Sequence, residues 1–183
     1  FQEAVAAADR ALALDPLSPT TAIWHARARR APGGHLGAVK ELHAGRGAPF
    51  PQTISFQLGA TYVLAGNMKA AIPEFKRAAD LSRENNPRFR AYLGYAYAMN
   101  GQAREAQEIL QSLLKLRERQ YVSSFGFALL HDALGEKAAA LEALDRADRE
   151  NAFEFTQLDI YPSFKTLKNE PRYQEIMRLR WRY

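Results

Sequence analysis

Small residues recur along the chain in three series that share one period. One series consists of alanines at intervals of 34, 33, 35 and 34 residues: Ala4, Ala38, Ala71, Ala106 and Ala140. Twelve residues before each of the last four stands another small residue: Ala26, Gly59, Gly94 and Ala128. Five residues before the same alanines stands a glycine: Gly33, Gly66, Gly101 and Gly135. Because the three series keep one register, they indicate an internal repeat of about 34 residues.

Apolar positions within each repeat follow the spacing of a helix. Four and seven residues after each alanine of the first series lie further packing positions on one helix face: Ala8 and Ala11, Leu42 and Gly45, Phe75 and Ala78, Leu110 and Leu113, Leu144 and Ala147. The preceding glycine suits the left-handed conformation that ends a first helix. The small residue suits a close crossing of two antiparallel helices. Each repeat is therefore predicted to be a helical hairpin whose faces are buried by stacking on its neighbours.

The predicted fold class is all-α, an α-α superhelix of helical hairpins. Residues 1–16 form a half repeat that holds only a second helix, and residues 152–183 form C-terminal capping helices. The four whole repeats between them are residues 19–50, which follow the pattern poorly, and residues 51–85, 86–120 and 121–151. Because Phe1 lies in the middle of a repeat, we interpret the chain as a fragment of a longer protein.

Two of the repeats carry a more specific motif. It consists of a leucine-glycine pair, a tyrosine and a later alanine: Leu58-Gly59 with Tyr62 and Ala71, and Leu93-Gly94 with Tyr97 and Ala106. In this motif the chain resembles the tetratricopeptide repeat family. The repeat at 19–50 departs from it, with His25-Ala26 in place of leucine-glycine and Arg29 in place of tyrosine. The resemblance implies that the first helix of each hairpin lines a concave groove that holds a peptide or a partner protein.

The tail after the last repeat carries a second motif. The run DIYPSFKTLKNEPRYQEIM at 159–177 is similar to the closing segment of multidomain bacterial signalling proteins. In those proteins the repeats follow a winged-helix DNA-binding domain, a nucleotidyl cyclase or a protein kinase. The resemblance implies two short capping helices, and it implies that the chain is the C-terminal module of a larger bacterial signalling or regulatory protein.

The composition of the chain excludes several kinds of functional site. The 183 residues include no cysteine, which excludes a disulfide framework, a thiolate metal site and a cysteine nucleophile. The absence of cysteine also favours a cytoplasmic location. No stretch approaches the roughly 18 to 20 apolar residues that span a bilayer, so we expect no membrane insertion. The net charge is +5, with basic residues concentrated at 19–50 and 163–183. On a helix these charges divide between faces, so we do not predict nucleic-acid binding.

No constellation of catalytic residues stands out. The four histidines, His25, His35, His43 and His131, lack the i, i+4 pairing with a neighbouring Glu that a helical zinc site needs. Ser123 and Ser124 precede His131 and Asp132, but no nucleophile elbow surrounds them, and Ser123 is expected to cap the following helix. The glycine clusters lack the Lys-Ser/Thr of a phosphate loop. We therefore predict no enzyme activity, no metal and no cofactor.

The predicted binding site is the groove that the family resemblance implies. Mapped onto the first helices, it would be lined by Trp24, Arg27, Arg30, Phe56, Gln57, Arg88, Tyr92, Tyr95 and Phe125. Arginine reads carboxylates in a bidentate manner and tyrosine adds contact area at little entropic cost. An alternative for Tyr92 and Tyr95 is that they only pack between neighbouring hairpins.

The predicted function is therefore that of a protein–protein interaction scaffold that binds a peptide or partner protein. Two alternatives remain open. The repeats could be the non-catalytic scaffold of an enzyme, a kinase or nucleotidyl cyclase, whose active domain lies elsewhere. Alternatively, the chain could form a homo-oligomer through the unpaired helix at residues 1–16.

Overall fold

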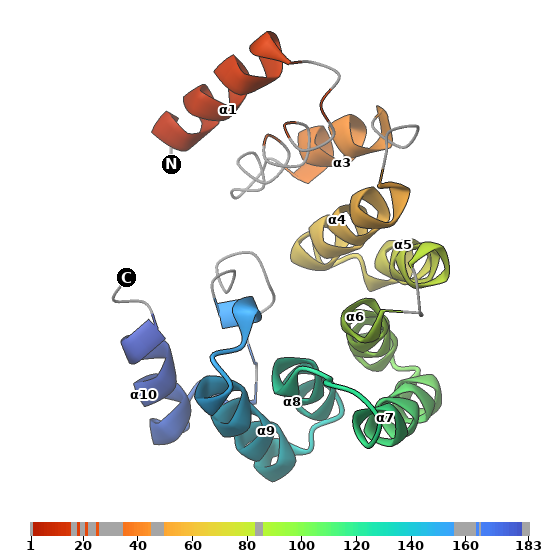
Figure 1. Ribbon diagram of the computed structural model, residues 1–183, viewed down its shortest axis with the longest axis vertical. Coiled ribbons are helices and arrows are strands. Elements are labelled where there is room, and N and C mark those ends of the chain that lie inside the picture. The colour runs from red at the N-terminus through yellow and green to blue at the C-terminus, as the bar shows by residue number, and fades with distance from the viewer. Residues whose placement is uncertain are drawn as a thin grey trace. The chain divides into compact units, whose positions relative to one another are not determined.

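A computed structural model of the chain describes residues 2–15, 18, 21, 25, 35–44, 50–82, 86–155, 164 and 166–180. Across these residues the regular elements are helices, which confirms the predicted all-α fold class (Figure 1). Their bounds are α1 Gln2–Leu14, α3 His35–Ala44, α4 Pro51–Leu64, α5 Met68–Leu81, α6 Pro87–Met99, α7 Ala103–Arg117, α8 Ser124–Ala133, α9 Lys137–Arg149 and α10 Pro171–Arg180. The chain divides into two compact units, Phe1–Asn85 (unit 1) and Asn86–Tyr183 (unit 2).

Glycine turns join the helices into hairpins, α4 with α5, α6 with α7, and α8 with α9. The turn glycines are left-handed, as predicted: Gly66 at φ 75°, Gly101 at φ 81° and Gly135 at φ 78°. At the first of them, the Gly66 N–H donates to the carbonyl of Val63 at 2.9 Å, which satisfies an acceptor at the end of α4. The fourth predicted turn glycine, Gly33, lies outside the described residues.

Unit 1 is held together by a close helix crossing. α3 packs on α4, and their shared core includes the buried residues Ala38, Leu42, Ile54 and Leu58. Where α4 crosses α5, Gly59 lets the ring of Phe75 lie directly against the backbone. A Cβ atom at Gly59 would be 2.6 Å from Cδ1 of that ring. The small residue at the predicted crossing is thus required by the large one opposite it.

Unit 2 repeats this arrangement twice. α6 contacts both α7 and α8, and α8 contacts α9. Their common core consists of Ala91, Leu110, Leu113, Val122, Phe127 and Leu130. At the crossing of α6 and α7, a Cβ atom on Gly94 would lie 3.1 Å from Cγ2 of Ile109 and 2.5 Å from Cδ2 of Leu130. Close approach again depends on glycine.

The C-terminal helix α10 docks on α9 through one arginine. Arg172 donates from Nε to Oδ1 of Asp145 at 2.6 Å, and its Nη2 lies 3.8 Å from Oδ2 of Asp148. Glu175, one turn along α10, accepts from Nη1 at 2.8 Å. Apolar side chains of this region are buried as well: Phe164, Leu167 and Ile176. The docking therefore combines partly buried charge pairs with buried apolar side chains.

Candidate partner-binding surface

The structure places the predicted groove residues in three groups. Trp24, Arg27 and Arg30 lie outside the described residues. Arg88, at the start of α6, is partly exposed. The remaining five side chains are buried, contrary to the expectation that they would line an open groove: Phe56, Gln57, Tyr92, Tyr95 and Phe125. For Tyr92 and Tyr95 this burial agrees with the alternative that they pack between neighbouring hairpins.

In unit 1, the Phe56 side chain packs within its own hairpin. Its ring is tilted by 52° against that of Phe75, with centroids 5.6 Å apart. This geometry is a favourable arrangement for two aromatic rings. Phe56 therefore fixes α4 on α5.

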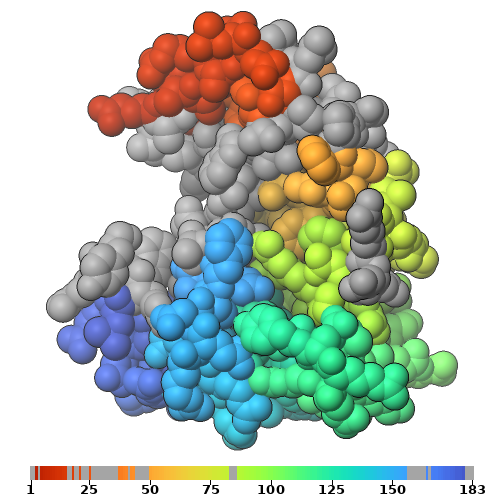
Figure 2. Space-filling model, viewed as in Figure 1, coloured from red at the N-terminus to blue at the C-terminus, as the bar shows by residue number. Residues whose placement is uncertain are grey.

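In unit 2, Phe125 of α8 lies under the residues that follow α9. Its ring meets Phe155 edge-on at 5.5 Å and Phe164 edge-on at 5.4 Å between centroids. Phe155 belongs to the short 3-10 helix at 153–155. In Figure 2 the lighter blue residues of this region lie against the rest of unit 2. The face of α8 that the sequence assigned to a partner is thus filled by this chain itself.

A buried carboxylate helps to hold this covering segment. Oδ1 of Asp132 accepts the backbone N–H of Thr166 at 3.0 Å and also accepts the hydroxyl of Thr166. Tyr95 of α6 and Tyr173 of α10 both interact electrostatically with the carboxylate of Asp132. Burial, and secondly that charge, raise the pKa of both phenols above their ordinary value. Both tyrosines are therefore held neutral well into the alkaline range.

This raised pKa predicts alkaline destabilisation. Once the pH passes the ordinary tyrosine pKa of about 10, the unfolded chain loses the Tyr95 proton while the folded chain retains it. The free energy of unfolding should then fall with rising pH, and it should fall less steeply in Tyr95→Phe. Urea denaturation of both proteins at neutral pH and above pH 10 measures the difference. Equal slopes for the two proteins would show that Tyr95 does not titrate in this way.

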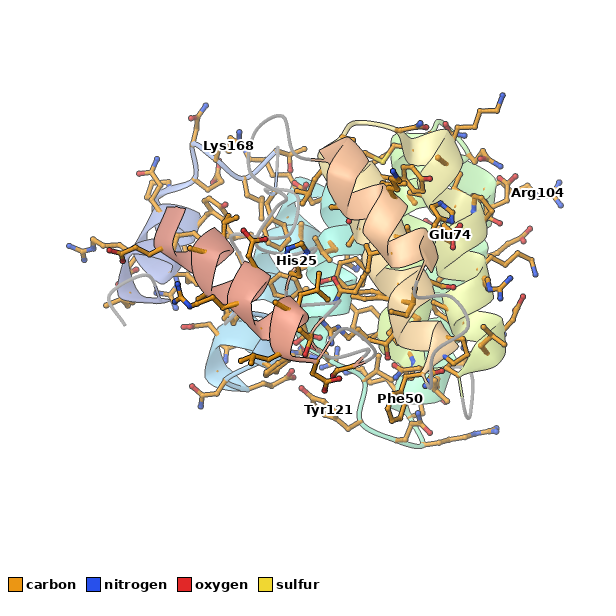
Figure 3. All side chains as sticks on the ribbon, turned by 90° about the horizontal axis from the view of Figure 1, so that it is seen from above. His25, Phe50, Glu74, Arg104, Tyr121 and Lys168 are labelled. Carbon is orange, nitrogen blue, oxygen red and sulfur yellow. The ribbon has the colours of Figure 1, made fainter. Side chains whose placement is uncertain are left out.

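Three side chains of unit 2 that are partly or largely exposed lie near the starts of α6 and α8 and after the end of α9. We use the term aromatic edge for Arg88, Tyr121 and Phe153. Phe153 is 59% exposed and Tyr121 is 68% exposed. Cζ of Arg88 lies 5.8 Å from the centroid of the Phe153 ring, within cation–π range. Figure 3 shows Tyr121 at the outer end of the connection between α7 and α8.

A network of hydrogen bonds around Glu150 holds Tyr121 of the aromatic edge. The carboxylate of Glu150 accepts the Ser124 N–H at 3.2 Å, the Ser124 hydroxyl at 2.7 Å and the Tyr121 hydroxyl at 3.3 Å. Arg117 donates to the same carboxylate at 3.3 Å. Burial, and then the charge of Glu150, raise the pKa of Tyr121. This network ties the ends of α7 and α9 to the start of α8.

The expected role of Ser123 needs a correction. Ser123 occupies the N-cap position of α8, but its side chain makes no capping hydrogen bond. Its hydroxyl donates instead to Oε2 of Glu154 at 3.1 Å. Glu150 takes over the capping of Ser124, because a carboxylate suits the positive end of a helix dipole. The cap is thus supplied by the following helix.

A small hollow adjoins the aromatic edge. Its lining includes Arg88, Tyr92, Ser123, Phe127 and Glu154. It has room for little more than a water-sized molecule. A small-molecule site needs a much larger enclosed volume. The hollow is therefore too small to be a small-molecule site.

Tyr121 and Phe153 were not among the predicted groove residues. Both follow the end of a second helix and lie outside the repeating packing positions. The sequence pattern does not distinguish Phe153 from Phe155, which lies two positions later and is buried. Arg88 is the predicted groove residue that the structure joins to them.

Three of the described histidines lie within hydrogen-bond distance of a polar side chain. Nε2 of His25 lies 2.6 Å from Oδ1 of Asp9, Nε2 of His43 lies 3.3 Å from the hydroxyl of Tyr62, and Nδ1 of His131 lies 2.5 Å from Oε2 of Glu136. Among the residues that the structure describes, no group of three His, Asp or Glu side chains could hold a metal ion. None of the described helices has the length and apolar character that crossing a membrane requires.

Comparisons with known proteins support the repeat architecture. A family model described as tetratricopeptide repeat matches residues 62–125. No curated protein matches the chain. The nearly identical TPR-like repeats of a Podosopora anserina protein described as a kinesin light chain superpose with a TM-score of 0.60 at 21% identity, covering 86% of this chain and 89% of theirs. A variant of that protein gives a TM-score of 0.61 at 21% identity, covering 85% and 88%.

These matches and the helical hairpins agree with each other. The family model spans α5, α6 and α7 in full, and the structural likeness extends over most of the chain. Tetratricopeptide repeats generally mediate protein–protein interaction, and folds of this kind are typically non-catalytic scaffolds. The chain therefore has the fold of a tetratricopeptide-like helical repeat protein.

Proposed function

We propose that this chain is an interaction scaffold that binds a segment of a partner protein at the aromatic edge of unit 2. The observation that carries the proposal is the contact of Arg88 with the ring of Phe153, which remains 59% exposed. Arginine and aromatic side chains dominate the binding energy of protein interfaces. Arg88 offers a carboxylate-binding group and the two rings offer apolar area.

The rigidity of this surface favours binding. Tyr121 is tied to Glu150, and Arg88 lies in the first turn of α6, whose N-terminus is capped by the Asn86 side chain accepting the Arg88 N–H at 3.0 Å. A surface that is already ordered loses little conformational entropy when a partner arrives. The partner segment that fits is an extended one with an acidic residue next to an apolar residue.

The other predicted groove residues take different roles in this proposal. Trp24, Arg27 and Arg30 stay candidates for partner contact in the repeat at 19–50. Phe56, Gln57, Tyr92, Tyr95 and Phe125 set the positions of the first helices from inside. The proposal also places the chain as the C-terminal module of a larger bacterial signalling or regulatory protein in the cytoplasm, where it could equally be the scaffold of a kinase or cyclase.

Selection from a displayed peptide library against the immobilised chain tests the proposal. Peptides that bind should be rich in acidic and apolar residues. Their affinity for the double variant Arg88→Gln/Phe153→Ala should fall by about tenfold or more, because each lost anchor removes about 1 kcal/mol or more.

The matched control is Arg104→Gln, which also removes one arginine, from the exposed outer side of α7 (Figure 3). Its binding should equal that of the original chain. Circular dichroism should show the same helicity for all three proteins. If every selected peptide binds the double variant as tightly as the original chain, the aromatic edge is not the binding surface.

A further inference from the structure

Two exposed basic residues near the starts of α7 and α9 are paired with acids. Nε of Arg104 lies 3.0 Å from Oε1 of Glu108. Nζ of Lys137 lies 2.6 Å from Oε1 of Glu170. A cation beside a carboxylate attracts a further anion only weakly at a distance, because the two charges cancel. These two residues therefore contribute little to the attraction of an acidic partner.

At the other end of the same helices, exposed basic residues are unpaired. Lys115 lies in the last turn of α7, Arg119 lies just after that helix, and Arg149 is the last residue of α9. All three are exposed. Within the part of unit 2 that the structure describes, none of the three side chains makes an ion pair or a hydrogen bond. We use the term basic end for Lys115, Arg119 and Arg149.

The basic end adjoins the aromatic edge. Arg119 stands two residues before Tyr121. Arg149 directly precedes Glu150, whose carboxylate accepts the Tyr121 hydroxyl at 3.3 Å, and it stands four residues before Phe153. An unpaired arginine thus accompanies each of the two exposed rings. A helix dipole alone favours basic residues at a helix C-terminus, but Arg119 lies beyond the end of α7.

From these observations we infer that the basic end steers an acidic stretch of the partner protein onto the aromatic edge. The inference rests on the proposed function and adds a property of the partner. Besides the acidic residue that Arg88 binds, further acidic residues flank the bound segment. Because attraction between exposed charges acts before contact, it speeds association and has little effect on dissociation. Arg88 and Phe153 are the anchors, and the basic end guides the partner to them.

The acids of this surface favour a peptide over a nucleic acid. Glu118 is exposed between Lys115 and Arg119, and the carboxylate of Glu150 lies at the Tyr121 hydroxyl. A nucleic-acid strand carries a phosphate at every nucleotide, so it would also meet these carboxylates. A peptide can place its acidic residues opposite the basic residues alone.

Stopped-flow binding tests the inference, with the acidic peptide that binds most tightly in the library selection as the probe. In about 0.1 M salt, the association rate constant of Arg119→Gln/Arg149→Gln should be about fivefold lower than that of the original chain, while the dissociation rate constant changes less than about twofold. In about 1 M salt the Debye length falls to about 3 Å, and the difference in association should disappear. The anchor variant Arg88→Gln/Phe153→Ala should instead dissociate faster.

The matched control is Arg104→Gln/Lys137→Gln. It removes the same charge from the same two helices at their other ends, about 20 Å away at a rise of 1.5 Å per residue. Since that distance exceeds the Debye length of about 10 Å in 0.1 M salt, the control should associate as fast as the original chain. Circular dichroism should show equal helicity for all of these proteins.

The outcomes separate the steering from the binding surface. Peptides that need Arg88 and Phe153 but associate equally fast with Arg119→Gln/Arg149→Gln contradict the steering alone. Peptides that bind the anchor variant as tightly as the original chain contradict the proposed function, and a library without any binding peptide contradicts both. A single-stranded oligonucleotide that binds as tightly as the peptide would also overturn the inference of an acidic protein partner.

Discussion

Replacing Gly59 with alanine is expected to destabilise unit 1 by about 1–3 kcal/mol, although alanine is intrinsically the better helix former. The added Cβ atom would lie 2.6 Å from Cδ1 and 2.7 Å from Cε1 of Phe75. The Phe75 ring is fully buried and also packs against Phe56, so it has little room to move away. Either α4 and α5 separate or the ring leaves its favoured rotamer.

The same substitution at Gly37 is the matched control. Gly37 lies in α3, and a Cβ atom there meets nothing within 4 Å. Gly37→Ala should therefore stabilise the chain by about 0.5–1 kcal/mol, because the backbone loses less entropy on folding. Urea denaturation followed by circular dichroism measures both changes. The close crossing of α4 and α5 would be refuted if Gly59→Ala were as stable as Gly37→Ala.

The largest expected effect in unit 2 comes from Phe125→Ala. Phe125 is completely buried and contacts two further rings, so its removal should cost about 3–5 kcal/mol. Because the contacts run to Phe155 and Phe164, the segment after α9 should also lose its hold on α8. Thermal denaturation measures the first effect, and faster hydrogen exchange at residues 153–155 measures the second.

Phe153→Ala is the control for this substitution. Phe153 belongs to the same short 3-10 helix as Phe155 but is 59% exposed, so its loss should change the stability by less than about 0.5 kcal/mol. The two variants separate packing from binding. If Phe125→Ala were as stable as Phe153→Ala, Phe125 would not act as a packing residue and would be a groove residue after all.

The fold could be predicted from the sequence because the same packing positions recur in each repeat. Ala71, Ala106 and Ala140 recur at the same place, and each is buried in a second helix. The glycine of each described turn adopts the left-handed conformation that its position indicated. These alanines and glycines determine packing within one hairpin. Because they recur at a fixed period, the sequence alone reveals them.

The candidate site was predictable only in part, because it depends on what covers each helix. Phe125 stands at a position that lines an open groove when nothing else packs there. The residues after α9 pack there in this chain, and that arrangement rests on the contacts of Phe155, Phe164 and Thr166 rather than on a repeated pattern. Arg88 was named as a groove residue because the family resemblance places it on a first helix. Tyr121 lies between α7 and α8, and Phe153 lies in the short 3-10 helix after α9, so both stand outside the repeating positions and periodicity gives no information on them.

The cover over α8 has a consequence for biosynthesis. Phe155 and Phe164 lie 30 and 39 residues after Phe125, so α8 leaves the ribosome well before its cover does. During that interval the apolar side of α8 faces solvent and other nascent chains. A chain whose translation stops after α9 keeps this side open permanently. Such truncated products are expected to be held by chaperones or to aggregate, while chains that extend through α10 escape both fates.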